Sequence, residues 1–366
     1  MKPLLDGIVG ARPNMMKMAP LARALAADGN FNLRIVHTGQ HYDYGMSGVF
    51  LRELNLPEPS VNLVAGRAGE GQDDQTANVI AGYGRYLDEQ GTSQGVIVVG
   101  DVNSTLACSI VAAKRQIPIA HVEAGLRSFD RSMPEEINRI VTDSLADVLL
   151  VSESSGRVNL AREGHSIESI HFVGNIMIDS LMAALDQVDK SDALSRLDLM
   201  PREYAYLTMH RPSNVDDENI LLNLLVTFEE LSQDLKLVFA VHPRTRKQID
   251  RLDYKFKSPA IILTEPQGYI DSLRLMRDAR MVLTDSGGMQ EETSVLGVPC
   301  LTLRLNTERP ITTTLGTSEL VGNRPERIKS AWRRVLNAQW RKGEKIPLWD
   351  GSTAPRIVEV LKKVWM

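Results

Sequence analysis

Residues Gly95–Arg127, GVIVVGDVNSTLACSIVAAKRQIPIAHVEAGLR, hold two short apolar runs with a helix-length segment between them. The apolar runs are Val96–Val99 and Pro118–His121. In the intervening Thr105–Arg115, apolar residues recur at i, i+3 and i+4 spacing, which is typical of an amphipathic helix. A strand, a helix and a second strand in this order form a βαβ unit with parallel strands. This stretch therefore predicts an α/β fold.

The same alternation extends over the rest of the chain in two series. The further strands expected in the first series are Gly7–Gly10, Leu33–His37, Val148–Val151 and His171–Val173. Those of the second series are Tyr204–Met209, Leu235–Val241, Ile261–Leu263, Met281–Thr284 and Pro299–Leu303. The other main expected helices are Ala19–Ala27, Glu136–Ala146, Glu218–Leu231 and Gly288–Leu296. We expect two doubly wound domains facing each other, with residues 1–174 in the first and 175–352 in the second.

Length and composition exclude several classes of protein. A chain of 366 residues is long enough for two domains, and 43% hydrophobic with 24% charged residues is ordinary for a soluble globular protein. A net charge of −4 argues against sequence-independent nucleic-acid binding, which needs a strongly basic surface. Cys108 and Cys300 lie in apolar stretches, so we expect two buried thiols and no zinc site. No run approaches the ~20 apolar residues of a membrane span or the apolar core of a signal peptide, so we expect a cytoplasmic protein.

A basic cluster follows the first expected strand. Gly10–Lys17, GARPNMMK, places Arg12 at a helix N-terminus, where free backbone amides favour anions, and Lys17 lies one turn further on. Solvated surface charge is the alternative interpretation of both residues. The cluster is not a dinucleotide fingerprint, because the pattern Gly-x-Gly-x-x-Gly is absent from it.

Acidic residues follow the next expected strands. Asp101 and Glu123 each come directly after or near the end of an apolar run, and Glu135 opens a helix after Pro134. Asp101 is equally well explained as a helix cap, and Glu135 as an acid that complements a helix dipole, with Arg139 as a salt-bridge partner. Two acids at the ends of neighbouring strands nevertheless favour proton transfer more than either acid alone.

The second half carries histidine–arginine pairs and a glycine-rich turn. His210-Arg211 ends one expected strand, and His242 with Arg244 repeats the arrangement after another, which favours anion binding over simple capping. A further strand then runs through Ser286-Gly287-Gly288 directly into a helix, where close backbone approach and free amides suit a phosphate. The helix carries Glu292, suited to ribose hydroxyls, and Arg309 follows the next strand as a further cation. A tight structural turn is the alternative.

Taken together, these motifs resemble the non-hydrolysing UDP-N-acetylglucosamine 2-epimerase family. The matching segments run in order over nearly the whole chain: GARPNMMKMAPL, HTGQHYDYGMS, GDVNSTLA, HVEAGLRSFDRSMPEEINR, VGNIMIDSL, MHRPSN, HPRT, EPQGY, LTDSGGMQEE and TERP. HVEAGLRS with MPEEINR and DSGGMQEE is a highly specific combination. The resemblance implies a GT-B fold, in which two Rossmann-like domains enclose the nucleotide sugar in a cleft and the C-terminal helix 353–366 packs back on the first domain.

The resemblance also implies roles for individual residues. Asp101, Glu123 and Glu135 would be catalytic carboxylates, and His210 would contact the diphosphate and assist the departure of UDP. The residues that we expect to bind substrate, from the resemblance or from their positions after expected strands, are Arg12, Lys17, Arg139, Arg211, His242, Gln267, Ser272, Ser286, Gly287, Gly288, Glu292 and Arg309. The expected partners are a UDP-sugar and a second copy of the chain in a homodimer, without nucleic acid or membrane.

The implied reaction interconverts UDP-GlcNAc and UDP-ManNAc for surface polysaccharide. UDP leaves C1, a carboxylate removes the C2 proton to give a glycal, and proton and UDP return with inverted configuration at C2. No nicotinamide and no metal is needed. Gln40-His41 continues here with Tyr42-Asp43, which departs from the pattern that many bacterial members use for an allosteric site. Tyr42-Asp43 and Arg-Ser-Phe-Asp also resemble relatives that act on UDP-2,3-diacetamido-glucuronate, so that substrate, and less readily a GT-B glycosyltransferase, remain alternatives.

Overall fold

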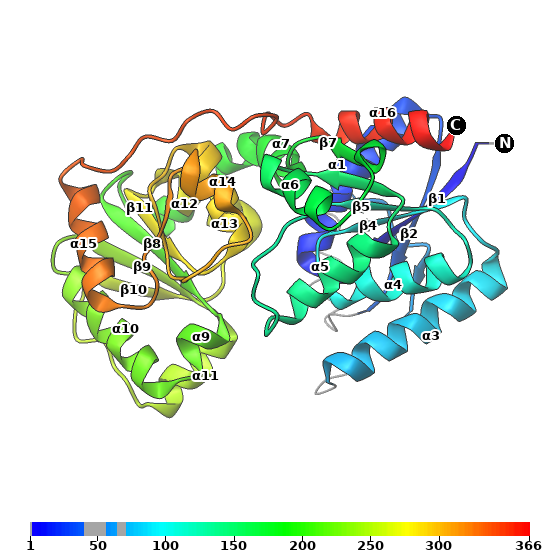
Figure 1. Ribbon diagram of the computed structural model, residues 1–366. Coiled ribbons are helices and arrows are strands. Elements are labelled where there is room, and N and C mark those ends of the chain that lie inside the picture. Colours follow the sequence, from blue (N-terminus) through cyan, green and yellow to red (C-terminus); the bar gives the residue numbers. More distant parts are fainter. Residues whose placement is uncertain (1, 40–55, 64–70) are drawn as a thin grey trace. The chain divides into compact units, whose positions relative to one another are not determined.

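The computed structural model describes residues 2–39, 56–63 and 71–366, and the chain divides into two compact units (Figure 1). The first unit combines Met1–Ser180 with Pro347–Met366, and the second is Leu181–Ile346. The division falls inside helix α7 (Ile176–Lys190), so the helical sequence pattern continues through it.

The first unit is built on a seven-stranded sheet whose described strand pairs are all parallel. The strand order is β3-β2-β1-β4-β5-β6-β7, which is the Rossmann order extended by one strand. From β1 to β7 the strands are Leu4–Val9, Asn32–His37, Val61–Asn62, Gly95–Val99, Ile119–Val122, Val148–Val151 and Ile170–Phe172. The order reverses between β1 and β4, and sheets of this kind bind ligands beyond the carboxyl ends of the strands at that point.

Helices cover both faces of this sheet, because its strands are apolar on both sides. On one face, α1 (Arg12–Asp28) and α16 (Thr353–Trp365) share a core with β1, β2 and β4. On the other face, α3 (Gln72–Gln90) and α4 (Asn103–Lys114) form a second core with the same strands. The remaining helices among the described residues of this unit are α5 (Pro134–Leu145), α6 (Ser154–Arg162), the start of α7 and the 3-10 turn Ile167–Ser169.

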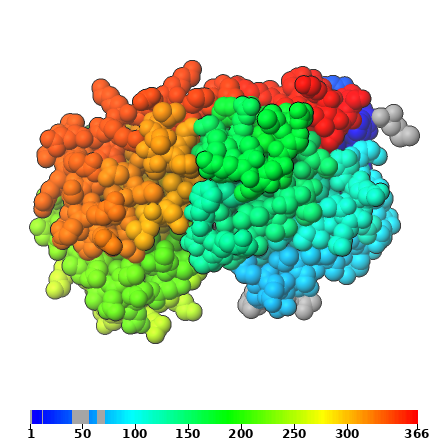
Figure 2. Space-filling model, viewed as in Figure 1, coloured from blue at the N-terminus to red at the C-terminus, as the bar shows by residue number. Residues whose placement is uncertain are grey.

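The C-terminal helix α16 is fixed to the first unit through α7. The carboxylate of Asp179 in α7 accepts hydrogen bonds from the N–H groups of Thr353 (3.0 Å) and Ala354 (2.7 Å) at the start of α16. The next residue, Ser180, donates its hydroxyl to the carbonyl of Met16 in α1. Figure 2 shows the C-terminal residues, in red, beside the blue N-terminal residues that α16 packs against.

The second unit contains a six-stranded sheet, parallel in all its described pairs, in the order β10-β9-β8-β11-β12-β13. From β8 to β13 the strands are Tyr204–Met209, Lys236–Val241, Ile261–Thr264, Met281–Thr284, Cys300–Thr302 and Ser318–Leu320. Its helices after α7 are α8 (Ala193–Arg196), α9 (Pro212–Val215), α10 (Glu218–Leu231), α11 (Pro243–Arg251), α12 (Tyr269–Asp278), α13 (Gly287–Leu296), α14 (Pro310–Thr314) and α15 (Pro325–Leu336). α10 and α15 bury their apolar side chains against this sheet, with the fully buried Trp332 at the centre of α15.

The α/β class and the two parallel sheets predicted from the sequence are confirmed. β3 and β13 were not predicted, because each is short and contains a single apolar residue, so neither forms an apolar run. Cys108 and Cys300 are free thiols and are buried, as expected. Within the described ranges, no helix has the length and apolar character needed to cross a membrane.

Candidate active site

The loops that follow β1, β4 and β5 meet at one edge of the first sheet. Val99 of β4 lies opposite Val122 of β5, and the N–H of Gly100 donates to the Val122 carbonyl (3.0 Å). Asp101 and Glu123 therefore follow adjacent strands at the carboxyl edge, where parallel sheets bind ligands.

Lys17 and Glu123 form a buried ion pair at this edge. The distance from Lys17 Nζ to Glu123 Oε2 is 2.5 Å, and the two side chains are 7% and 3% exposed. Glu123 has a φ of +72°, an uncommon backbone conformation for a residue with a side chain, and such strain is concentrated at functional sites. Gly100, with φ of +68°, leaves room for the lysine, because a Cβ there would lie 2.8 Å from Lys17 Nζ. The local backbone thus places an ammonium against a carboxylate.

Asn14, which sequence reasoning missed, connects the first loop to this pair. Its side-chain oxygen accepts from the N–H groups of Gly10 (3.3 Å) and Ala11 (3.1 Å), and its amide nitrogen donates to the Val99 carbonyl (2.7 Å). The loop after β1 is therefore tied to the end of β4. Arg12 is the first residue of α1, but its side chain lies outside the described part of the structure.

Asp101 is held by Arg139 and does not cap α4, whose N-cap position is taken by Val102. The guanidinium of Arg139 binds Asp101 and, at 2.6 Å, the buried carboxylate of Glu136. Burial would raise the pKa of Glu136, but the N–H of Ser128 and the charge of Arg139 lower it. Arg139 is thus enclosed by protein carboxylates, an arrangement that orients Asp101.

Glu135 lies in the first turn of α5 and is exposed, whereas the adjacent Glu136 is buried. The exposed carboxylate is free to meet a ligand, while its neighbour accepts from the N–H groups of Ser128 (3.0 Å) and Phe129 (2.8 Å) and fixes the preceding loop. The two consecutive acids of the Pro-Glu-Glu motif therefore have different environments.

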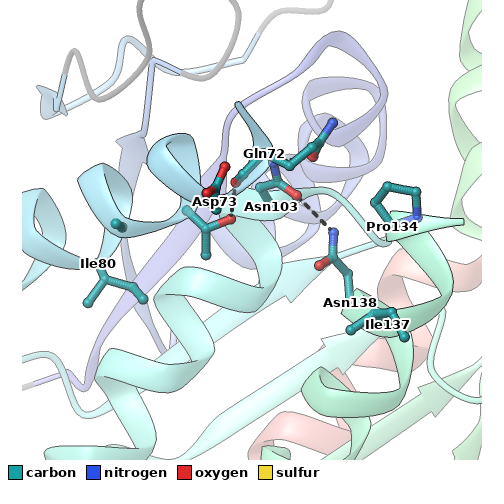
Figure 3. A pocket seen from close by; sticks show the side chains of 9 residues that line it. Gln72, Asp73, Ile80, Asn103, Pro134, Ile137 and Asn138 are labelled. Carbon is teal, nitrogen blue, oxygen red and sulfur yellow. Dashed lines mark hydrogen bonds between the residues drawn. The ribbon is translucent and has the colours of Figure 1, made fainter. Parts of the chain in front are cut away.

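A shallow cavity of about 480 Å³ lies between α3 and the first turns of α4 and α5, and its lining includes Asn103 and Asn138 but none of the three candidate carboxylates (Figure 3). Its polar end is a cluster of amides, in which Asn103 donates to Gln72 (2.7 Å) and Gln75 (2.7 Å). Asn138 donates both to Asn103 (3.1 Å) and to the carbonyl of Asp101 (2.9 Å). The amide cluster therefore supports the loop that carries Asp101.

In the second unit, His210 is oriented by Asp285. The Nδ1 of His210 lies 3.0 Å from an oxygen of the fully buried Asp285, while the histidine side chain is 41% exposed. Burial would raise the pKa of Asp285, but His210 and the N–H groups of His210 and Arg211 lower it. A carboxylate at Nδ1 fixes the ring so that Nε2 faces outward, as in catalytic histidines generally.

His242 adjoins His210, with ring centroids 5.3 Å apart. Its Nδ1 accepts the N–H of Arg244 and caps α11, so Nε2 carries the proton of the neutral ring. Burial lowers the pKa of His242, and the charge of His210 lowers it further. His242 therefore also has a structural function as a helix cap.

The glycine-rich turn after β11 adjoins a cluster of acids and arginines. Ser286 is the N-cap of α13, and a Cβ at Gly287 would lie 2.7 Å from Glu308, whereas a Cβ at Gly288 would meet open space. Arg304 binds Glu308 at 2.7 Å. Burial would raise the pKa of Glu308, but the charges of Arg304 and Arg309 hold it far below its usual range.

Arg309 and Arg211 complete this cluster. Arg309 is bound to Glu291 of α13 and lies 4.0 Å from Glu308, and Arg211 approaches Glu308 at 3.8 Å. Three arginines thus contact Glu308, which adjoins Gly287 at the N-terminus of α13, where free amides favour anions.

Glu292 is buried in α13, facing α12. Its pKa is raised to about 8. Burial is the main cause, the Tyr269 hydroxyl lowers the pKa, and the charge of Glu291 raises it. On α12, Ser272 pairs its hydroxyl with Tyr206 (3.1 Å), and Gln267, in the loop before α12, donates to the carbonyl of Glu265 (2.7 Å). Glu292 is therefore largely a neutral acid at neutral pH in the free protein.

We expect Glu292→Gln to stabilise the protein increasingly as the pH rises. The folded state holds a proton on Glu292 up to about pH 8, whereas an unfolded glutamate loses it near 4.5, so the contribution of Glu292 to stability is lost across that window. The effect amounts to about 1.4 kcal/mol for each pKa unit. Urea unfolding at several pH values measures it, with the exposed Glu203→Gln as control. A difference between Glu292→Gln and wild type that stays constant with pH contradicts this assignment.

Sequence comparisons identify the family. The sequence profile described as UDP-N-acetylglucosamine 2-epimerase matches residues 23–362. The chain belongs to the UDP-N-acetylglucosamine 2-epimerase family. A UDP-N-acetylglucosamine 2-epimerase of Methanocaldococcus jannaschii is 40% identical over 98% of each chain. A UDP-2,3-diacetamido-2,3-dideoxy-D-glucuronate 2-epimerase of Pseudomonas aeruginosa is 34% identical over 98% of this chain and 99% of its own.

Membership of the epimerase family agrees with the fold. The crystal structure of the M. jannaschii enzyme in complex with UDP-GlcNAc and UDP has a TM-score of 0.90 and 38% identity, covering 98% of this chain and 99% of that one. The α/β fold of the GT-B class is therefore confirmed. Tyr42 and Asp43, which separate the two kinds of substrate in the sequence interpretation, lie outside the described residues.

Each unit brings together part of the expected epimerase site. The first unit places Lys17 with Glu123, and Arg139 with Asp101, while the second gathers the histidines, arginines and glycine turn. Sequence reasoning missed Asn14, Asp285 and Glu308. Asp285 could have been found, because it directly follows an apolar strand, as Asp101 nearly does. Glu308 had no such signal.

Proposed function

We propose that this protein is an isomerase that interconverts UDP-GlcNAc and UDP-ManNAc. The observation that carries this proposal is the buried Lys17–Glu123 pair at the carboxyl edge of the first sheet, within a chain that belongs to the epimerase family throughout its length. Relatives named UDP-N-acetylglucosamine 2-epimerase supply the substrate class.

The reaction begins with cleavage of the bond between C1 and the diphosphate oxygen. UDP leaves with the bonding electrons, and the positive character that develops at C1 acidifies the hydrogen at C2. A carboxylate among Asp101, Glu123 and Glu135 takes this proton, which leaves a 2-acetamidoglucal. A proton delivered to the other face of C2 and return of UDP to C1 give the epimer.

The residues of the second unit hold UDP in this proposal. The amides at the start of α13 and the side chains of Arg211 and Arg309 bind the diphosphate, and His210 assists its departure. Glu292 accepts hydrogen bonds from the ribose hydroxyls, and the segment from Gln267 to Ser272 frames the uracil. The carboxylates of the first unit perform the proton transfers.

The second candidate substrate is UDP-2,3-diacetamido-glucuronate. It is favoured by the P. aeruginosa relative and by the sequences around Tyr42-Asp43 and Arg127–Asp130, which resemble such enzymes. Its extra carboxylate at C5 of the ring requires a cation or hydrogen-bond donor that UDP-GlcNAc does not. Relative kcat/KM values for the two compounds distinguish them.

Incubation with UDP-GlcNAc in D₂O tests the leading proposal. We expect deuterium to appear at C2 of both epimers in NMR spectra, without added nicotinamide or sugar acceptor, because the C2 proton exchanges with solvent on the carboxylates. Release of free sugar and UDP would instead indicate a hydrolysing enzyme. The absence of both exchange and a manno product would refute epimerisation of this substrate.

We further propose a cytoplasmic homodimer that supplies surface polysaccharide synthesis. The proposal rests on the family resemblance and on the nucleotide sugar itself, which is an activated donor for glycosyl transfer. Sedimentation velocity of the purified full-length chain tests the oligomeric state, and a monomer at micromolar concentration contradicts it.

A further inference from the structure

His121 sits at the carboxyl end of β5, is fully buried, and has an oxygen atom at each ring nitrogen. Its Nδ1 lies 2.6 Å from Asp143 Oδ1, and its Nε2 lies 2.8 Å from the carbonyl oxygen of Gly100. Both distances are those of strong hydrogen bonds. His121 therefore joins β5 to α5 on one side and to the end of β4 on the other.

Both neighbours of the ring are acceptors. The Gly100 carbonyl can only accept, so Nε2 carries a proton. Asp143 accepts from the Gly125 N–H and lies 2.7 Å from the guanidinium of Arg127, which keeps its proton, so Asp143 is a carboxylate and also accepts. Nδ1 must then carry a proton as well. A ring that donates from both nitrogens is an imidazolium cation.

The surrounding charges balance this cation. The second oxygen of Asp143 accepts from the Gly125 N–H (3.0 Å) and binds Arg127 (2.7 Å). Arg127 in turn binds Glu163 of α6 at 2.6 Å. Two cations and two carboxylates thus alternate beneath the loop after β5, and each buried charge has an opposite partner, as buried charges require.

Gly100, whose carbonyl oxygen His121 binds, lies next to the Lys17–Glu123 pair. Gly100 is the residue whose missing side chain admits Lys17, and a Cβ there would also lie 3.8 Å from the Glu123 carboxylate. Asp101 follows Gly100 directly, Glu123 follows His121 by two residues, and Asp143 belongs to α5, which opens with Glu135. The His121 ring is therefore hydrogen-bonded to the residue before Asp101 and to the helix that carries Glu135. Glu123 lies two residues after His121 itself.

We propose that His121 is a positioning residue, protonated on both ring nitrogens, that holds Gly100 and α5 in fixed positions, so that Asp101, Glu123 and Glu135 keep their relative positions. The second half of this proposal rests on the proposed epimerase function, whereas the charge of the ring does not.

Nitrogen-15 NMR of the wild-type protein with labelled histidine tests the charge directly. We expect both ring nitrogens of His121 to give protonated resonances, because each lies against an acceptor oxygen. His37 and His242 are internal references, because the Nδ1 of each accepts a backbone N–H (from Gly39, 3.0 Å, and Arg244, 3.2 Å) and is unprotonated in the structure. The two ring-nitrogen signals that disappear in His121→Gln are assigned to His121. A neutral His121 ring at about pH 7 overturns the proposal.

Steady-state kinetics test the positioning role. Glutamine cannot donate to both Gly100 and Asp143 as the ring does, so we expect His121→Gln to lower kcat by about 10- to 100-fold, as loss of the partners of metal ligands does. KM and the Kd for UDP should stay unchanged, because the residues proposed to bind UDP lie in the second unit. Asp143→Asn should lower kcat similarly if His121→Gln fails to fold, and His171→Gln, on β7 of the same sheet, is the matched control.

The kinetic results of these variants support or overturn the positioning role. A kcat drop confined to His121→Gln and Asp143→Asn, with UDP binding intact, supports it. Wild-type kcat in both variants overturns the positioning role, and so does a parallel loss of UDP binding and kcat, which indicates a general folding defect. A wild-type protein without epimerase activity would remove the proposed function, and the NMR result would then still support or overturn the charge of His121.

Discussion

Replacement of Glu123 by Gln is expected to abolish exchange of the C2 hydrogen while leaving UDP binding intact. Glu123 is the most buried of the three candidate carboxylates, it sits on a strained backbone, and it contacts Lys17 at 2.5 Å. Removal of a general base typically costs 10²- to 10⁴-fold in rate, so the exchange rate should fall by about that amount. Glutamine keeps an oxygen that can accept from Lys17 Nζ, so the fold should survive.

Deuterium exchange, isothermal titration with UDP and the melting temperature together check the Glu123→Gln variant. Asp88→Asn is the control, since it removes a carboxylate of the same unit that is 65% exposed and bound to Arg115 at the surface. Surface ion pairs contribute little, so that variant should behave as wild type. Exchange at the wild-type rate in Glu123→Gln would remove Glu123 from the mechanism.

Gly125→Ala is expected to lower the stability of the protein strongly. Gly125 has φ of +79°, and a Cβ there would lie 2.4 Å from the carbonyl oxygen of Gly156 in α6. The obstacle is backbone, which cannot rotate away as a side chain can. The N–H of Gly125 also donates to Asp143, so a displaced backbone would weaken the cluster around His121. We expect a loss of about 3 kcal/mol or more in the free energy of unfolding.

Gly29→Ala is the matched control for this variant. Gly29 ends α1 with φ of +74°, similar to that of Gly125, but a Cβ there would meet only the Lys2 amine at 3.8 Å. The difference between the two variants isolates the steric contact from the cost of positive φ, which alone is about 1 kcal/mol. Urea unfolding monitored by circular dichroism measures both. Equal losses would show that α6 moves to accommodate the methyl group.

The sequence predicts the layers of this fold well because each unit repeats one short pattern. Val96–Val99 is apolar throughout and Tyr204–Met209 is mostly apolar, with Thr208 as the exception, as expected for strands buried on both faces. Residues that work through a neighbour distant in sequence are harder to predict. His121 and Asp143 are 22 residues apart, and only the packing of α5 beside β5 brings the carboxylate to Nδ1.

The role of Asp101 also depends on a residue that is distant in sequence. The sequence alone allows it to cap α4 or to take part in proton transfer, because both roles suit an acid after a strand. The choice depends on Arg139, 38 residues later, which is drawn toward Asp101 by its own position on α5. Glu292 is similar, since its raised pKa depends on burial beside Tyr269, which no spacing in the sequence indicates.

The return of α16 to the first unit has a consequence for synthesis on the ribosome. The side chains of Ala354, Ile357, Val358 and Leu361 belong to the core formed by α1 and β1. The N-terminal unit therefore lacks part of its interior until α16, which follows the second unit in the chain, has been made, whereas Leu181–Ile346 is contiguous and can fold as it emerges. Asp179, just before the second unit, binds the start of α16, just after it. The second unit is in effect an insertion whose two flanking segments are joined by one carboxylate, and a nascent chain can complete its N-terminal unit only after the second unit has been made.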